Sequence, residues 1–191
     1  MKNLRHKIKE DRITVDIICL LLLAILLSLP MFRQEKDIFF DDGSQHLMRA
    51  FGTYQSIVQN GNGNIISDFV NGFGYSWNLF YGPLSVDIII VISLIIGAFN
   101  LGFKITMCAI LFLAGFLMYK FIKEMTQNGN TALLASFIYM SSPYFFTDIY
   151  IRHAVGETMA FVFIPLVFLG LYHLFNTEKN HYYLIFRKLP D

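Results

Sequence analysis

Two adjacent aspartates, Asp41 and Asp42, follow a long apolar segment in the stretch FFDDGSQHLMRA. Asp42 can cap the helix that follows, with Gln45 three residues later completing a capping box. A carboxylate can also accept the proton of a substrate hydroxyl group and act as a general base. Asp42 and His46 are four residues apart, so they share a helix face and offer a weak metal-binding pattern. The sequence pattern leaves all three interpretations open.

A second polar group lies in the short stretch YIRHAVGE, between two apolar segments, and contains Tyr150, Arg152, His153 and Glu157. Ionisable residues close to membrane depth are candidates for function. The planar guanidinium of Arg152 suits the oxygen atoms of a phosphate group, which it can bind with two parallel hydrogen bonds. The structural alternative is an ion pair between Arg152 and Glu157 across a tight loop.

The composition is that of a membrane protein. Of the 191 residues, 55% are hydrophobic and 15% are charged, and the mean hydropathy is +0.51. Soluble domains have roughly 25% charged residues. The net charge of +1 does not bear on nucleic-acid binding, but the sequence has no basic patch with interleaved aromatic residues, so we expect no nucleic-acid partner. Cys19 and Cys108 lie inside apolar runs, so we expect small buried hydrophobic residues and no disulfide.

Four apolar segments are long enough to cross a membrane, which takes about 20 residues. The first, 13–32, follows a basic tail, 1–12, and has no signal-peptide cleavage site. Asp16 lies in the first turn of this segment, where a carboxylate suits the positive end of a helix dipole. Segment 84–99 reaches only about 24 Å and is too short. The remaining crossings are expected at 103–122, 131–150 and 158–175, with Pro143 and Pro165 inside the last two.

The distribution of Lys and Arg decides whether segment 84–99 crosses. If it crosses, seven of these residues lie inside and eight outside; if it does not, ten lie inside and five outside. Because cytoplasmic loops carry an excess of positive residues, the second arrangement is favoured. The sequence therefore predicts an all-α integral protein of the cell membrane with four crossings, a cytoplasmic N-terminus, and 84–99 embedded or lying on the outer leaflet. Asp41, Asp42 and Glu157 then share the outer side.

The outer loop 33–83 begins with an amphipathic pattern that predicts an interfacial helix. Its apolar residues recur at three- and four-residue spacing, at Leu47, Ala50, Phe51, Tyr54, Ile57 and Val58. The polar residues assigned to its other faces are His46, Arg49, Thr53 and Ser56. We expect a single transmembrane domain, 13–176, between the cytoplasmic segments 1–12 and 177–191.

Four stretches together resemble a family of bacterial membrane proteins named 6-pyruvoyl-tetrahydropterin synthase-related. They are FFDDGSQHLMRA, GFGYSWNLFYGPL, ALLASFIYMSSPYFFTDIYIRHAVGE and PLVFLGLY. The order of elements is also similar to that of GT-C glycosyltransferases and YfhO-type proteins. These families are longer, so the resemblance implies an N-terminal fragment or a truncated product that lacks later helices.

The resemblance implies transfer of a sugar from a polyprenyl-phosphate carrier to an extracytoplasmic envelope glycan. Asp41 or Asp42, together with Glu157, match the acidic catalytic positions. Arg152, His153, Tyr150 and His46 are the expected substrate- and phosphate-binding residues. No cofactor is certain; if a divalent metal ion takes part, its expected ligands are Asp42 and Glu157.

The expected partners are membrane lipid, a polyprenyl-phosphate-linked sugar, and the missing C-terminal helices or another membrane protein. The alternatives are a non-catalytic membrane protein of polysaccharide assembly or export, and an inactive remnant.

Overall fold

The computed structural model describes residues 2–33, 43–63, 73–76 and 82–176, with side chains from residue 13 onward. The regular elements of these residues are helices. In chain order they are α1 (Lys2–Arg33), α2 (Gly43–Asn60), α4 (Leu84–Ile96), α5 (Phe99–Thr126), α6 (Gly129–Met140), α7 (Pro143–Thr147), the π-helical turn η1 (Asp148–Arg152) and α8 (Val155–Asn176).

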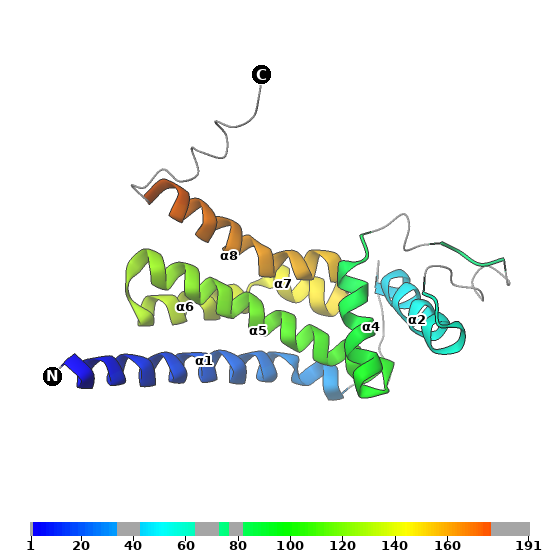
Figure 1. The fold of residues 1–191 in the computed structure, drawn as a ribbon, viewed down its shortest axis with the longest axis horizontal. Coiled ribbons are helices and arrows are strands. Elements are labelled where there is room, and N and C mark those ends of the chain that lie inside the picture. Colours follow the sequence, from blue (N-terminus) through cyan, green and yellow to red (C-terminus); the bar gives the residue numbers. More distant parts are fainter. Residues whose placement is uncertain (1, 34–42, 64–72, 77–81, 177–191) are drawn as a thin grey trace, which may run out of the picture.

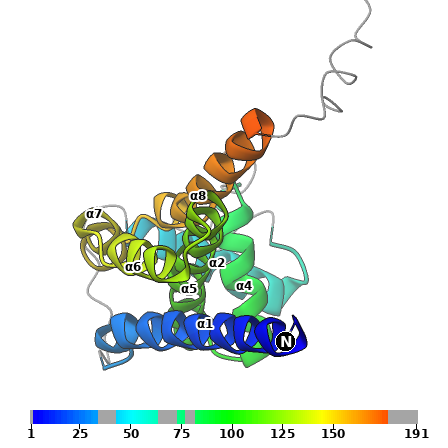
Figure 2. The ribbon, with the colours of Figure 1, turned by 90° about the vertical axis from the view of Figure 1, so that its left-hand side faces the viewer.

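The long helices run back and forth along one axis (Figure 1). α1 and the pair α6–α7 run toward one end of the bundle, whereas α5 and α8 run away from it. α5 is the central helix and packs against α1, α4, α6 and α8 (Figure 2). α4 lies across the end of the bundle that α1 and α7 approach, and α2 packs on α4.

Three of the described helices are long and apolar enough to cross a membrane: Ile13–Arg33, Phe99–Thr126 and Val155–Asn176. The prediction of an all-helical chain with membrane-length apolar helices is therefore confirmed. α4 is also apolar, but its 13 residues make it shorter than these three. The N-terminal helix begins at Lys2, so Asp16 lies well inside it and the prediction that Asp16 belongs to a first turn was wrong.

The crossing predicted over 131–150, with Pro143 inside it, is formed by more than one helix. α6 ends at Met140, and α7 begins at Pro143 after the extended residue Ser142 (φ −65°, ψ 140°). Proline cannot donate a backbone hydrogen bond, and it disfavours helical geometry in the residue before it. Proline is well suited to the first turn of a new helix, and Pro143 occupies that position here. Pro165 lies within α8 without dividing it.

The faces predicted for the amphipathic helix are correct only in part. Ala50 is buried and Leu47, Tyr54 and Ile57 pack against the core, whereas Phe51 and Val58 are exposed. The polar residues Arg49, Thr53 and Ser56 of α2 were assigned to other faces, yet they are buried. An Arg49 Nη2 atom donates to the Gly82 carbonyl oxygen at 3.2 Å, and the Thr53 hydroxyl donates to the Arg49 carbonyl oxygen at 2.8 Å. Buried polar groups require such partners. Neighbouring backbone carbonyls thus allow the polar stripe of α2 to face inward.

Candidate functional site

A tight connection between α7 and α8 brings four polar side chains together. Tyr144, Asp148 and Arg152 are spaced four residues apart, so they recur on one face through α7 and η1. His153 then adopts the left-handed conformation (φ 50°), and the Ala154 N–H donates to the Asp148 carbonyl oxygen at 3.1 Å. This turn reverses the chain and places Glu157, in the first turn of α8, opposite Arg152.

Arg152 holds Glu157 with both ends of its guanidinium. The distance from Nη1 to Oε2 of Glu157 is 2.6 Å, and that from Nη2 to Oε1 is 2.8 Å. The Tyr144 hydroxyl donates to the same Oε2 atom at 2.8 Å. Nη1 also donates to Oδ1 of Asp148 at 3.0 Å. The Arg152–Glu157 ion pair, which was the structural alternative to a functional role for these residues, is therefore present.

Tyr144 and Asp148 are the members of this cluster that the sequence pattern did not single out, and Asp148 is the more deeply buried. It is fully buried, and its Oδ2 atom has no hydrogen-bond partner. Burial raises the pKa of the Asp148 carboxyl, the negative charge of Glu157 raises it further, and Arg152 opposes both effects. The hydrogen bond to Glu157 raises the pKa of Arg152, which stays cationic. The spacing of four residues between Asp148 and Arg152 was the available signal.

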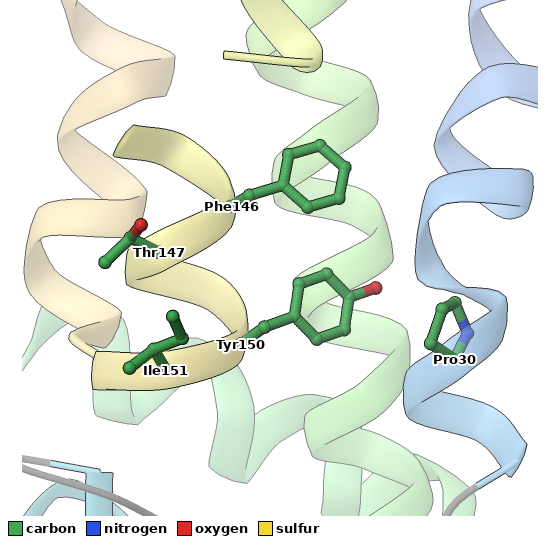
Figure 3. Close-up of a pocket in the computed structure, with 5 residues that line it drawn as sticks. All are labelled: Pro30, Phe146, Thr147, Tyr150 and Ile151. Carbon is green, nitrogen blue, oxygen red and sulfur yellow. The ribbon is translucent and has the colours of Figure 1, made fainter. Parts of the chain in front are cut away.

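An open groove of about 350 Å³ lies between α1 and the α7–η1 segment. It is lined by Pro30, Phe146, Thr147, Tyr150 and Ile151. Figure 3 shows the rings of Phe146 and Tyr150 directed toward α1. The Tyr150 hydroxyl donates to the main-chain carbonyl of Leu27, one turn before Pro30. Tyr150 thus joins η1 to α1.

The remaining predicted site residues are placed in part. His46 of α2 is half-buried and interacts electrostatically with Glu157, so α2 approaches the cluster. The Nδ1 atom of His153 lies 3.3 Å from the Ile151 carbonyl oxygen. Asp41 and Asp42 lie outside the described residues. Within the described part of the chain, no three His, Cys, Asp or Glu side chains are grouped to hold a metal ion.

No known protein family matches the chain, and no solved structure is similar to it. The chain is 28% identical over 170 residues to a protein of Lactococcus lactis subsp. cremoris (strain MG1363) that is described as uncharacterized. The match covers 85% of this chain and 27% of the relative. The chain thus spans about a quarter of the length of a larger protein to which it is similar.

Proposed function

We propose that the chain is part of a membrane glycosyltransferase-like protein that transfers a sugar from a polyprenyl-phosphate carrier to an extracytoplasmic envelope glycan. The observation that carries this proposal is that one segment, α7–η1, contributes side chains both to the Arg152 cluster and to the apolar groove. Arg152 and Ile151 are adjacent in η1; the first belongs to the charged cluster and the second lines the groove. A lipid phosphate has the same two parts, an anionic head and an apolar tail.

The proposed topology places this cluster on the outer side of the membrane. α1, α5, the α6–α7 pair and α8 supply four alternating passes, and α4 stays at the outer end (Figure 1). Ten of the Lys and Arg residues then lie on the cytoplasmic side and five outside. The excess of positive residues at the end that carries the N-terminus supports a cytoplasmic N-terminus.

The chemistry requires a cation for the leaving phosphate and a base for the acceptor hydroxyl. Arg152 supplies the positive charge that stabilises the phosphate oxygens as negative charge develops on them. Asp41, Asp42 or Glu157 accepts the proton of the sugar hydroxyl. If a divalent metal ion takes part, Asp42 and Glu157 are its proposed ligands. His46 and His153, near the same turn, are the proposed contacts for the sugar.

One observation favours a second candidate function. Both carboxylate oxygens of Glu157 are engaged by Arg152, which is also the arrangement of a purely structural ion pair. A non-catalytic membrane protein of polysaccharide assembly or export would retain this pair to fix the α7–α8 turn. An inactive remnant would retain it for the same reason.

Transfer of a labelled sugar from a polyprenyl phosphate to envelope glycan, measured in membranes that contain the full-length protein, tests the proposal. Glu157→Gln and Arg152→Gln should each lower the rate, by about 10²–10⁴-fold if Glu157 is the base. Membrane insertion should be unchanged, because both residues are partly exposed. Wild-type rates for both variants would reject the catalytic interpretation in favour of the structural one.

A further inference from the structure

We propose that Arg152 and Tyr144 form a phosphate-binding site that Glu157 occupies until a phosphate monoester or diphosphate displaces it. This inference rests on the proposed function for the source of the phosphate, a lipid carrier. It adds that the Glu157 carboxylate competes with the phosphate for Arg152 and Tyr144. Binding of the phosphate then releases the Glu157 carboxylate beside the bound anion.

The donor geometry around Glu157 is that of an anion site. Three donor groups, the two Nη atoms of Arg152 and the Tyr144 hydroxyl, converge on one carboxylate at 2.6–2.8 Å. The guanidinium fork binds phosphate oxygens with the same two parallel hydrogen bonds that it makes to a carboxylate. A phosphate group therefore fits the donors that now hold Glu157.

The two carboxylates of the cluster differ in how easily they can leave Arg152. The side chain of Glu157 is 46% exposed, whereas that of Asp148 is fully buried. Water can replace the hydrogen bonds of an exposed carboxylate, so rotation of Glu157 into water costs less than removing the buried Asp148 carboxylate from Arg152. The 3.0 Å contact from Asp148 to Arg152 Nη1 remains on the buried side. Asp148 thus keeps the guanidinium in place while Glu157 is exchanged for a ligand.

The surroundings leave room for the incoming group. Gly156 is exposed, and a Cβ atom added there would meet nothing within 4 Å. Gly156 and Glu157 also lie in the first turn of α8, a helix of 22 residues. The first N–H groups of a helix lack partners within the helix and favour anions. A phosphate on Arg152 would therefore meet open space and further donors on the α8 side.

Equilibrium dialysis of the full chain in detergent micelles tests this exchange, with inorganic pyrophosphate and geranyl phosphate as separate probes. Glu157→Gln should bind both probes about two- to five-fold more tightly than the wild type, because the competing charge is gone. Arg152→Gln should lose binding, and Tyr144→Phe should weaken it. The matched control is Glu124→Gln, which should leave the Kd unchanged. Glu124 is 44% exposed and pairs with His173 at 3.1 Å, near the other end of α8.

The two probes separate the sources of the phosphate. Tighter binding of both supports a site for the phosphate group itself, and tighter binding of geranyl phosphate alone supports a lipid headgroup site. Unchanged or weaker binding of both probes by a folded Glu157→Gln variant would overturn the exchange. If that variant does not fold, Glu157→Asp replaces it; its shorter carboxylate should also bind the probes more tightly than the wild type, and equal or weaker binding would overturn the exchange.

The sugar-transfer assay distinguishes failure of this inference from failure of the proposed function. If Glu157→Gln loses sugar transfer but binds both probes with unchanged affinity, the proposed displacement of Glu157 by phosphate is wrong. The proposed glycosyltransferase function is then still supported. Tighter anion binding in the same variant with wild-type transfer would retain the exchange and reject a catalytic role for Glu157.

Discussion

The hydroxyl group of Tyr119 donates a hydrogen bond of 2.6 Å to the Asp16 carboxylate and accepts one of 2.5 Å from the Lys123 ammonium group. Asp16 and Tyr119 are 103 residues apart, and both are buried. The bond joins α1 to the central helix α5. Asp16 therefore holds two helices together, which explains a carboxylate far from the start of its own helix.

Tyr119→Phe should lower the free energy of unfolding by about 1.5–3 kcal/mol, the contribution typical of a hydrogen bond to a charged group. The change removes the hydroxyl and leaves the buried Asp16 carboxylate without that donor. Denaturant titration in micelles measures the effect. The control is Thr126→Ala, which removes an exposed hydroxyl bonded to its own helix and should change stability by less than about 0.5 kcal/mol. Equal stability of both variants would show that the Tyr119 bond contributes nothing.

Gly102→Ala should destabilise the protein by forcing α4 away from α5. A Cβ atom at Gly102 would lie 2.6 Å from the Cα atom and 2.8 Å from the backbone nitrogen of Ser93. Backbone cannot move aside as a side chain can, and overpacking typically costs about 1–3 kcal/mol. Gly170→Ala in α8 is the matched control, since a Cβ there meets nothing within 4 Å. The control should be neutral or stabilising, because alanine favours helices. The melting temperatures of both variants, measured by thermal unfolding in micelles, test this prediction. Similar melting temperatures would contradict the close contact between Gly102 and Ser93.

Cysteine labelling tests the proposed topology. In a background with Cys19 and Cys108 replaced by alanine, a membrane-impermeant thiol reagent added from outside should modify cysteine placed at Asn62 or His153. It should not modify cysteine at Asn128, in the exposed turn between α5 and α6. Labelling at Asn128 without labelling at His153 would show that the chain has the opposite orientation, and it would contradict a site on the outer side.

Thr147→Trp should weaken binding of geranyl phosphate and leave binding of inorganic pyrophosphate unchanged. The larger side chain occupies part of the groove that Thr147 lines, where we propose that the lipid tail lies. Ile138→Trp, at a 64% exposed position on α6, is the control for adding a large aromatic residue. Equal loss of both probes in Thr147→Trp would indicate a distorted turn, and no loss of geranyl phosphate would remove the groove from the binding site.

Asp42→Asn separates a general base from a helix cap. A base depends on the negative charge, so sugar transfer should fall by about 10²–10⁴-fold. A cap depends on it little, because asparagine caps helices about as well as aspartate. Asp41→Asn, assayed in the same membranes, shows which aspartate carries the activity. Normal transfer in both variants, with less folded protein in Asp42→Ala, would identify the stretch as a cap alone.

The sequence by itself determined the elements that depend on local composition. Apolar runs such as 13–32 and 158–175 predict membrane-length helices because a helix in lipid satisfies its own backbone. The same local reasoning named the Arg152–Glu157 pair, since five residues across a tight turn can bring two side chains together. The assignment of His46 to the same site as Glu157 came instead from the family resemblance.

Only the tertiary structure decided which polar side chains are buried and what each one contacts. Arg49 was assigned to a polar face of its helix, yet it is enclosed, and the enclosed Asp148 was not among the expected site residues. Tyr150, expected to bind substrate, donates to the carbonyl of Leu27, 123 residues away. A buried polar group is tolerated where a partner meets it. For Arg49 and Tyr150 that partner comes from a distant segment. No local pattern records the position of such a segment, because it is set by how whole helices pack.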